Sequence, residues 1–147
     1  MSPADFATER ELATERVLSF TREQVLATFT DPKRLARWWG PAGFTNEFDT
    51  CDPRPGGDWL FTMVGPDGAR YKNQNRFVEV GPERVVIQHV NDPHFVLTVI
   101  LEPVTGGTHL YWRQSFATVD LRKALEGVCI PANEQNLDRL NAELARG

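Results

Sequence analysis

The chain has 147 residues, 41% of them hydrophobic and 10% aromatic, and its formal net charge is −4 at pH 7. This length and composition predict one folded domain over residues 1–147 with a substantial core. Acidic and basic residues are interspersed, and no basic stripe is present to neutralise phosphates, so nucleic acid is not an expected partner. There is no apolar run of membrane-spanning length and no signal-peptide pattern, which indicates a cytoplasmic protein without a membrane partner.

The first forty residues predict a strand followed by two short helices. In residues 8–20, apolar and polar residues alternate loosely and turn residues are lacking, which favours a long strand with one solvent-exposed face. Thr21 and Gln24 have the spacing of a capping box at the start of a helix. The pair Asp31-Pro32 is a second helix-start signal, and a helix is expected over 32–39, before a Gly-Pro breaker.

The middle of the chain predicts about six consecutive strands. Apolar residues there recur every second position, and short turns rich in Gly, Pro, Asn and Asp separate the runs. The expected strands are 44–50, 59–63, 71–80, 85–90, 95–101 and 108–117. Short connections favour an antiparallel meander, and a sheet of this size is expected to curl.

The last thirty residues return to a helical period, with an apolar stripe at Leu137, Leu140 and Leu144. Because a proline inside a helix removes a hydrogen bond and clashes with the preceding turn, Pro131 predicts a break. We therefore expect a short helix over 121–126 and a long helix that begins at about Pro131. One helix cannot fill a wide curled sheet, so a cavity is expected between the two.

Three of the four tryptophans stand beside residues that turn the chain. Residues 38–41 read Trp-Trp-Gly-Pro, and residues 54–59 read Arg-Pro-Gly-Gly-Asp-Trp. Large apolar surface next to sharp turns predicts a shaped, aromatic-lined interior. The Pro-Gly-Gly sequence is interpreted as a tight turn before a strand rather than as an anion-binding loop.

The order of these motifs resembles the START-like (SRPBCC) superfamily, and within it the group named after the activator of the heat-shock chaperone ATPase. The likeness extends from Val17 to Ala145 and includes the stretches 29–41, 54–59 and 131–140. It implies an α+β helix-grip fold, in which a curved antiparallel β-sheet wraps around a long C-terminal α-helix, with two short helices after the first strand. An apolar ligand cavity between sheet and helix is part of what the resemblance implies.

The sequence departs from this group's pattern at two positions. Asn75 and Ala132 stand where many members have glycine, and Ala132 is expected to narrow the cavity at the helix. The family name does not imply a chaperone function, because the chain offers no counterpart to the activator's separate N-terminal chaperone-binding domain, and a fold does not transmit function.

Inward positions of the predicted strands and of the last helix supply the candidate ligand-binding residues. They are Trp39, Trp59, Phe61, Met63, Phe77, His89, Leu97, Val99, Trp112, Gln114, Glu134 and Leu137. For each aromatic residue, ordinary core packing is the alternative to lining a pocket. For Glu134 the alternative is an exposed acid near a helix start.

The polar candidates do not form a recognisable catalytic or metal site. Of the three histidines, only His89 is placed to meet the cavity; His94 lies in a turn and His109 is expected to face outward. No carboxylate or cysteine stands at a metal-ligand spacing from His89, so no metal and no cofactor are expected. Cys51 and Cys129 are expected to be buried free thiols.

These features favour a small-molecule binding protein whose internal cavity holds an apolar or aromatic ligand. A cavity-based enzyme of the polyketide cyclase or aromatase type is an alternative, and a chaperone-associated interaction domain is another. Formation of a homodimer is a further alternative for the partner of this protein. An enzyme would require an acid and a base within reach of one point in the cavity, and the sequence offers only loose candidates for that pair.

Overall fold

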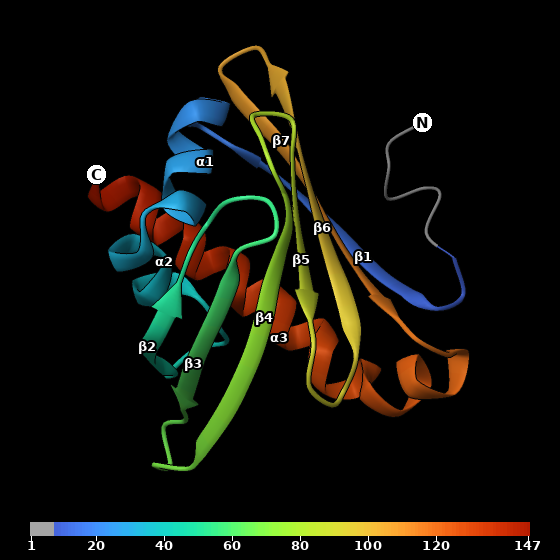
Figure 1. Cartoon of the computed structure of the whole chain (residues 1–147). Helices are drawn as coiled ribbons and strands as arrows, with labels where there is room; N and C mark the ends of the chain where they lie inside the picture. The colour runs from blue at the N-terminus through green and yellow to red at the C-terminus, as the bar shows by residue number, and fades with distance from the viewer. Residues whose placement is uncertain (1–7) are drawn as a thin grey trace.

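The computed structural model describes residues 8–147 as a seven-stranded antiparallel sheet with three helices (Figure 1). The strand order is β1-β7-β6-β5-β4-β3-β2. The strands are β1 (Glu11–Leu18), β2 (Thr45–Cys51), β3 (Asp58–Val64), β4 (Arg70–Val80), β5 (Arg84–His89), β6 (Phe95–Val104) and β7 (Gly107–Phe116), and the helices are α1 (Arg22–Thr30), α2 (Pro32–Trp38) and α3 (Val119–Arg146). Strands β2 to β7 form a consecutive meander, and β1 pairs with β7 at the edge.

The sheet curves around α3, and α1 and α2 cover the end of the sheet near the C-terminal half of that helix (Figure 1). Leu137, Leu140 and Leu144 of α3 are buried and belong to the same core as the inward residues of the strands. This arrangement is an α+β helix-grip fold, so the predicted fold class is confirmed.

Both short helices begin at the predicted signals. The Thr21 side chain accepts from the backbone N–H of Gln24 at 3.1 Å, and the Gln24 side chain closes the capping box. Asp31 caps α2 by accepting from the Lys33 N–H at 3.0 Å. Trp38 is the last residue of α2, and Trp39 is its extended C-cap.

The predicted break at Pro131 is wrong, because α3 runs without interruption from Val119 to Arg146. Pro131 lies at an exposed position of the helix and is not among its buried residues. Thr118 caps the true start by accepting from the Leu121 N–H at 3.1 Å. Packing of the leucine stripe then holds the helix together despite the proline.

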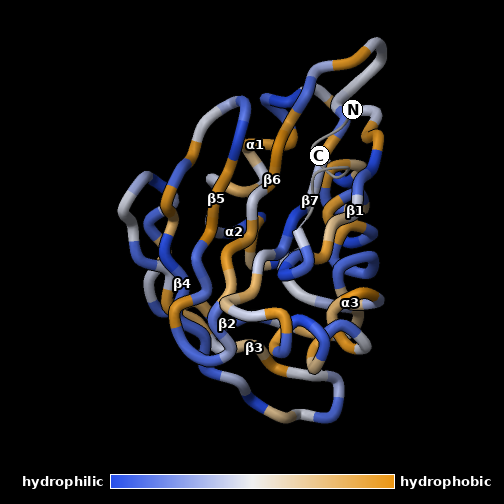
Figure 2. The backbone as a smooth tube through the Cα atoms, turned by 90° about the vertical axis from the view of Figure 1, so that its right-hand side faces the viewer, coloured by the Kyte–Doolittle hydropathy of each residue, from blue (hydrophilic) through white to orange (hydrophobic). Residues whose placement is uncertain are grey.

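The first strand is shorter than predicted and covers Glu11–Leu18 rather than residues 8–20. The predicted two-residue alternation is present in the burial of β5 and β7. In β7, for example, Leu110, Trp112, Gln114 and Phe116 are all buried on the face toward α3. Figure 2 shows that β6, in the middle of the sheet, is largely hydrophobic.

The Pro-Gly-Gly loop is a structural turn, as predicted. The backbone N–H of Gly56 donates to Phe77 O at 2.7 Å, and that of Gly57 donates to Arg54 O at 2.8 Å. A Cβ atom at Gly57 would lie 1.9 Å from Asp52 O, so only glycine fits there. Both amides are used inside the protein and are not available to an anion.

Cys51 and Cys129 are free thiols, as predicted, but each is half-buried rather than fully buried. Within residues 8–147, no helix is both long enough and apolar enough to cross a membrane. The prediction that the chain carries no signal peptide concerns its first residues, of which 1–7 lie outside the described residues.

Candidate functional site

A cavity of about 640 Å³ lies between the inward face of the sheet and α3. Its walls come from the loop after α2, from inward positions of β3 to β7, from the β5–β6 turn and from the middle of α3. The lining residues are Trp39, Gly40, Pro41, Phe44, Met63, Tyr71, Lys72, Asn73, Asn75, His89, Asn91, Asp92, Pro93, Phe95, Leu97, Trp112, Gln114, Val128, Cys129, Ala132, Asn133 and Asn136.

Trp39 and Trp59, two of the tryptophans beside the chain turns, are in contact, and Trp39 lines the cavity. The ring of Trp39 lies edge-on to Trp59, with centroids 4.8 Å apart, and 6.2 Å from Trp112. Trp38 packs behind them against Phe29 at 4.9 Å, and its indole N–H donates to Thr28 O. Trp39 and Trp112 therefore face the cavity, while Trp38 belongs to the core.

The loop that carries Trp39 is attached to α3 by side chains of the helix. The backbone N–H of Gly40 donates to Asn136 Oδ1 at 3.1 Å, and that of Ala42 donates to Gln135 Oε1 at 3.1 Å. Gly40 adopts a φ of +98°, which favours glycine. These bonds fix the wall formed by the loop relative to the wall formed by the helix.

A partly buried arginine completes this attachment. The guanidinium of Arg139 donates to five backbone oxygens, those of Arg37, Trp39, Gly40, Pro41 and Phe44, at 2.9–3.0 Å. Burial lowers the pKa of Arg139 from its ordinary value. The five hydrogen bonds to backbone oxygens nevertheless stabilise the charged guanidinium. They also hold the end of α2 and the following loop in place.

A second polar connection joins α2 to the C-terminal end of α3. Glu143 is only 4% exposed and accepts from Arg37 at 2.8 and 2.9 Å and from Arg34 at 3.0 Å. The hydrogen bonds from Arg37, reinforced by Arg34, lower the pKa of Glu143 to about 2 against the opposing effect of burial. This network lies outside the cavity and supports its frame.

His89 is the most buried titratable side chain of the cavity wall, with 7% of its surface exposed. Its Nδ1 lies 2.7 Å from Pro93 O, its Nε2 lies 2.8 Å from Asn73 Oδ1, and its ring stacks on Phe95 at 4.6 Å. Burial lowers the pKa of His89, and the hydrogen bond to Pro93 offsets part of that effect. The neutral ring is therefore favoured at pH 7, with both nitrogens engaged inside the protein.

Opposite His89, the wall formed by β7 and α3 is uncharged. Asn133 donates to Gln114 Oε1 at 3.1 Å across the gap between strand and helix. Burial raises the pKa of the Cys129 thiol, so this group is protonated at pH 7.

Two buried polar atoms of the lining residues have no hydrogen-bond partner among the described residues. They are Asn75 Oδ1 and Trp112 Nε1, and each side chain is 2% exposed. An unpaired polar atom at such burial costs about 1–3 kcal/mol. A bound group that forms a hydrogen bond with either atom would remove that cost.

The structure places six of the twelve predicted site residues at the cavity wall. They are Trp39, Met63, His89, Leu97, Trp112 and Gln114. Five others are core residues behind the wall: Trp59, Phe61, Phe77, Val99 and Leu137. These five residues therefore fit the alternative interpretation, ordinary packing in the core, better than a position on the cavity wall.

Glu134 points away from the cavity. It lies in the middle of α3 rather than at a helix start, and its carboxylate meets Arg16 of β1 at 3.2 Å. Its neighbours Asn133 and Asn136 face the cavity instead. The physical reason is the position of each residue around the helix, since one residue corresponds to a rotation of about 100°.

The sequence analysis identified Gln114 but missed the asparagine side chains of the cavity. Asn73, Asn75, Asn133 and Asn136 all line it. For Asn73 and Asn75 a signal was present, because they alternate in phase with the buried Phe77 along the same strand.

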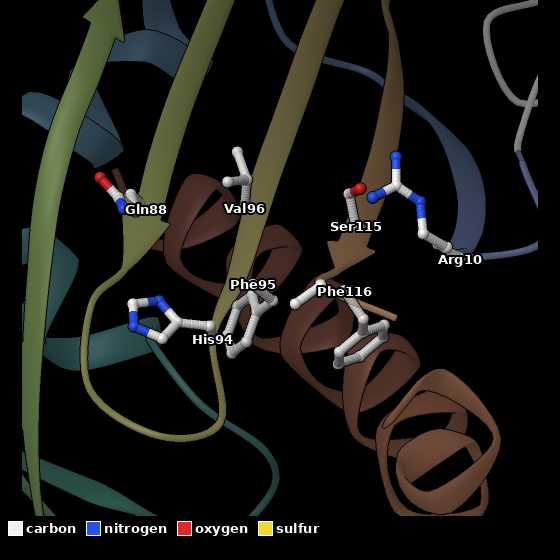
Figure 3. Close-up of a pocket in the computed structure, with 8 residues that line it drawn as sticks. Arg10, Gln88, His94, Phe95, Val96, Ser115 and Phe116 are labelled. Atoms are coloured by element: carbon white, nitrogen blue, oxygen red, sulfur yellow. The ribbon is translucent and has the colours of Figure 1, made fainter. Parts of the chain in front are cut away.

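A smaller hollow of about 210 Å³ lies at the ends of β5, β6 and β7 (Figure 3). In Figure 3, Arg10 reaches toward Ser115, and Phe95 lies beside Phe116. The charged and polar groups Arg10 and His94 are exposed there, so water already solvates them. This hollow offers a ligand less buried surface than the larger cavity.

Among residues 8–147, no three His, Cys, Asp or Glu side chains come together in a way that could hold a metal ion. His109, expected to face outward, lies 3.1 Å from Glu15 on the edge strand and stacks on Tyr111 at 4.2 Å.

A curved sheet around a long C-terminal helix, with a cavity between them, defines a START-like helix-grip protein. The sequence of residues 19–145 matches the family described as "Activator of Hsp90 ATPase homolog 1-like protein", and the chain belongs to that family. The resemblance deduced from the tryptophan and Pro-Gly-Gly motifs is thereby confirmed.

Solved structures of several bacterial proteins share the fold over nearly the whole chain. A protein from Nitrosomonas europaea superposes with a TM-score of 0.84 at 22% identity, covering 94% of this chain and 96% of its own. A protein from Chromobacterium violaceum gives 0.79 at 28% identity, with 90% and 95% covered. The AHSA1 protein from Silicibacter pomeroyi gives 0.72 at 26% identity, with 92% and 97% covered. No curated protein matches the sequence.

Proposed function

We propose that this protein binds a small, mainly apolar aromatic compound in the cavity between the sheet and α3. The observation that carries the proposal is the cavity itself, about 640 Å³ with walls from Trp39, Phe44, Leu97 and Trp112. Ligand pockets of proteins commonly measure roughly 300–1,000 Å³, with apolar walls and a few oriented polar groups. The cavity has the size, the walls and the polar groups of such a pocket.

The rim of the cavity supports access from solvent. Tyr71 is 51% exposed and Val128 is 70% exposed, and both line the cavity. The ring of Tyr71 lies 6.2 Å from that of Phe44, which continues the aromatic surface inward. Exposed apolar side chains at a cavity mouth favour the entry of an apolar ligand over that of a charged one.

Binding is favoured over catalysis because the wall lacks a paired acid and base. His89 is buried, but the partners of its two ring nitrogens are a backbone oxygen and an amide. Asp92 is the carboxylate among the lining residues, and it is exposed at the rim. General acid–base chemistry needs groups that can exchange a proton with the substrate, and His89 is held away from that task.

Binding can be tested with a neutral solvatochromic dye such as Nile red. We expect saturable binding of one dye per chain, a blue shift of its emission, quenching of tryptophan emission and a higher melting temperature. Ala132→Phe, on the cavity wall of α3, should abolish these changes by filling the cavity. Ala124→Phe, at an exposed position of the same helix, is the control and should bind as the wild type does.

Loss of binding in both variants, or in neither, would contradict the proposal, because the dye would then be bound elsewhere.

A single-domain organisation, a cytoplasmic location and a homodimer remain predictions from the sequence.

A further inference from the structure

Resting on the proposed function, we infer that Asn75 selects an uncharged ligand that carries a hydroxyl group, such as a phenol. The aromatic body of this ligand would lie along Trp39, Leu97 and Trp112. Its hydroxyl would meet the amide of Asn75.

The first step of the argument is that the interior of the cavity carries no charge. Lys72 and Asp92 line the cavity but are exposed at its rim. Burial favours the neutral ring of His89 and the protonated thiol of Cys129. The nearby guanidinium of Arg139 is occupied by backbone oxygens of the loop after α2. An anionic or cationic ligand would therefore be desolvated without a compensating partner.

The second step is that the other amide side chains of the wall are already engaged within the protein. Asn73 contacts His89 and donates to Tyr71 O at 3.0 Å. Asn91 accepts from Gln74 N–H at 2.9 Å and donates to Lys72 O. These groups hold the walls in place and have less capacity left for a ligand.

The amides on the helix side are engaged in the same way. Gln114 accepts from Asn133, and Asn136 accepts from the Gly40 N–H. Asn75 differs from all of these, because its buried Oδ1 has no partner among residues 8–147. A group that fits the cavity and donates a hydrogen bond would satisfy it.

The third step concerns the kind of group that fits. A carboxamide presents an acceptor oxygen and a donor nitrogen side by side, and a hydroxyl can donate to one and accept from the other. Asn75 lies between His89 on β5 and Trp59 on β3 in the strand register, on the inward face of the sheet. A ligand hydroxyl there would leave the rest of the molecule against the apolar wall.

The experiment measures the dissociation constants of naphthalene, 2-naphthol and 2-naphthoate by displacement of Nile red at pH 7. The variants are Asn75→Leu, which keeps the volume but removes the amide, and Asn75→Gly, which keeps the test valid if the leucine variant does not fold. Gln74→Leu, at the neighbouring exposed position of β4, is the control.

In the wild type and in Gln74→Leu, 2-naphthol should bind about tenfold more tightly than naphthalene, and 2-naphthoate more weakly than 2-naphthol. In the Asn75 variants the preference for 2-naphthol should disappear, while naphthalene still binds within a few-fold of its wild-type affinity. Equal affinities in the wild type, or a preference that persists in the Asn75 variants, would overturn the role of Asn75 and leave the proposed function intact. Failure of all three compounds to bind the wild type would overturn both.

Discussion

The backbone N–H of Gly40 donates to Asn136 Oδ1 at 3.1 Å, which joins the loop after α2 to the middle of α3 across 96 positions of sequence. Both residues line the cavity, so this hydrogen bond contributes, together with those of Gln135 and Arg139, to the distance between two of its walls. The shape of the cavity therefore depends on how α3 is attached to the rest of the molecule.

Asn136→Ala should destabilise the protein by about 1–3 kcal/mol, because it leaves the buried Gly40 N–H without an acceptor. Urea unfolding followed by tryptophan fluorescence measures the change. Gln135→Ala is the matched control: it removes the acceptor of the Ala42 N–H, but at an exposed position, and should cost less than about 0.5 kcal/mol. Equal losses of unfolding free energy in the two variants would show that the buried Asn136 hydrogen bond contributes no more to stability than the exposed one of Gln135.

The carboxylate of Glu143 should make stability depend on pH in the acid range. Its pKa in the folded protein is about 2, below the ordinary value of 4.5, chiefly because Arg37 donates to it. The ionised form is thus stabilised by folding. This contribution is complete above about pH 4.5 and is lost as the pH falls toward 2.

Glu143→Gln should remove much of that pH dependence and lower stability near pH 7 by roughly 2–3 kcal/mol, since Arg34 and Arg37 lose their charged partner. Free energies of unfolding of the wild type and of the variant, measured between pH 7 and pH 3, provide the comparison. Parallel curves for the two proteins would refute the assignment.

Pro131→Ala should stabilise the protein by about 1–3 kcal/mol, because the alanine N–H restores the helical hydrogen bond that proline lacks. The reason is specific to an unbroken α3, in which Pro131 lies far from both ends of the helix and is exposed to solvent. If the helix instead began at Pro131, proline would be favourable at its first position and the substitution would be neutral or destabilising. Thermal and urea unfolding distinguish the two cases.

The sequence predicted much of the fold because many of its signals are local. Thr21 with Gln24, Asp31 with Pro32, and the alternation in the strands each identify an element without knowledge of its partners. Pro131 misled the prediction because its cost is offset by the packing of Leu137, Leu140 and Leu144, which depends on the tertiary structure.

The site was predicted less completely, because lining a cavity and packing in a core require the same residue types. Trp39 faces the cavity and Trp59 lies behind it, although the two rings are in contact. Glu134 was misplaced because its partner, Arg16, lies 118 positions away in the sequence. The unpaired amide of Asn75 becomes visible only when the hydrogen bonds of its neighbours are known.

The most direct test of the central claim is nuclear magnetic resonance of the ¹⁵N-labelled protein titrated with 2-naphthol. We predict that the side-chain signals of Trp112 and Asn75 shift in proportion to occupancy, because both residues line the cavity and have unpaired polar atoms. The indole signal of Trp38, which donates to Thr28 O in the core, should remain in place. Shifts confined to Gln88, Val96 and Ser115 on the smaller hollow (Figure 3), with Trp112 and Asn75 unchanged, would contradict the account.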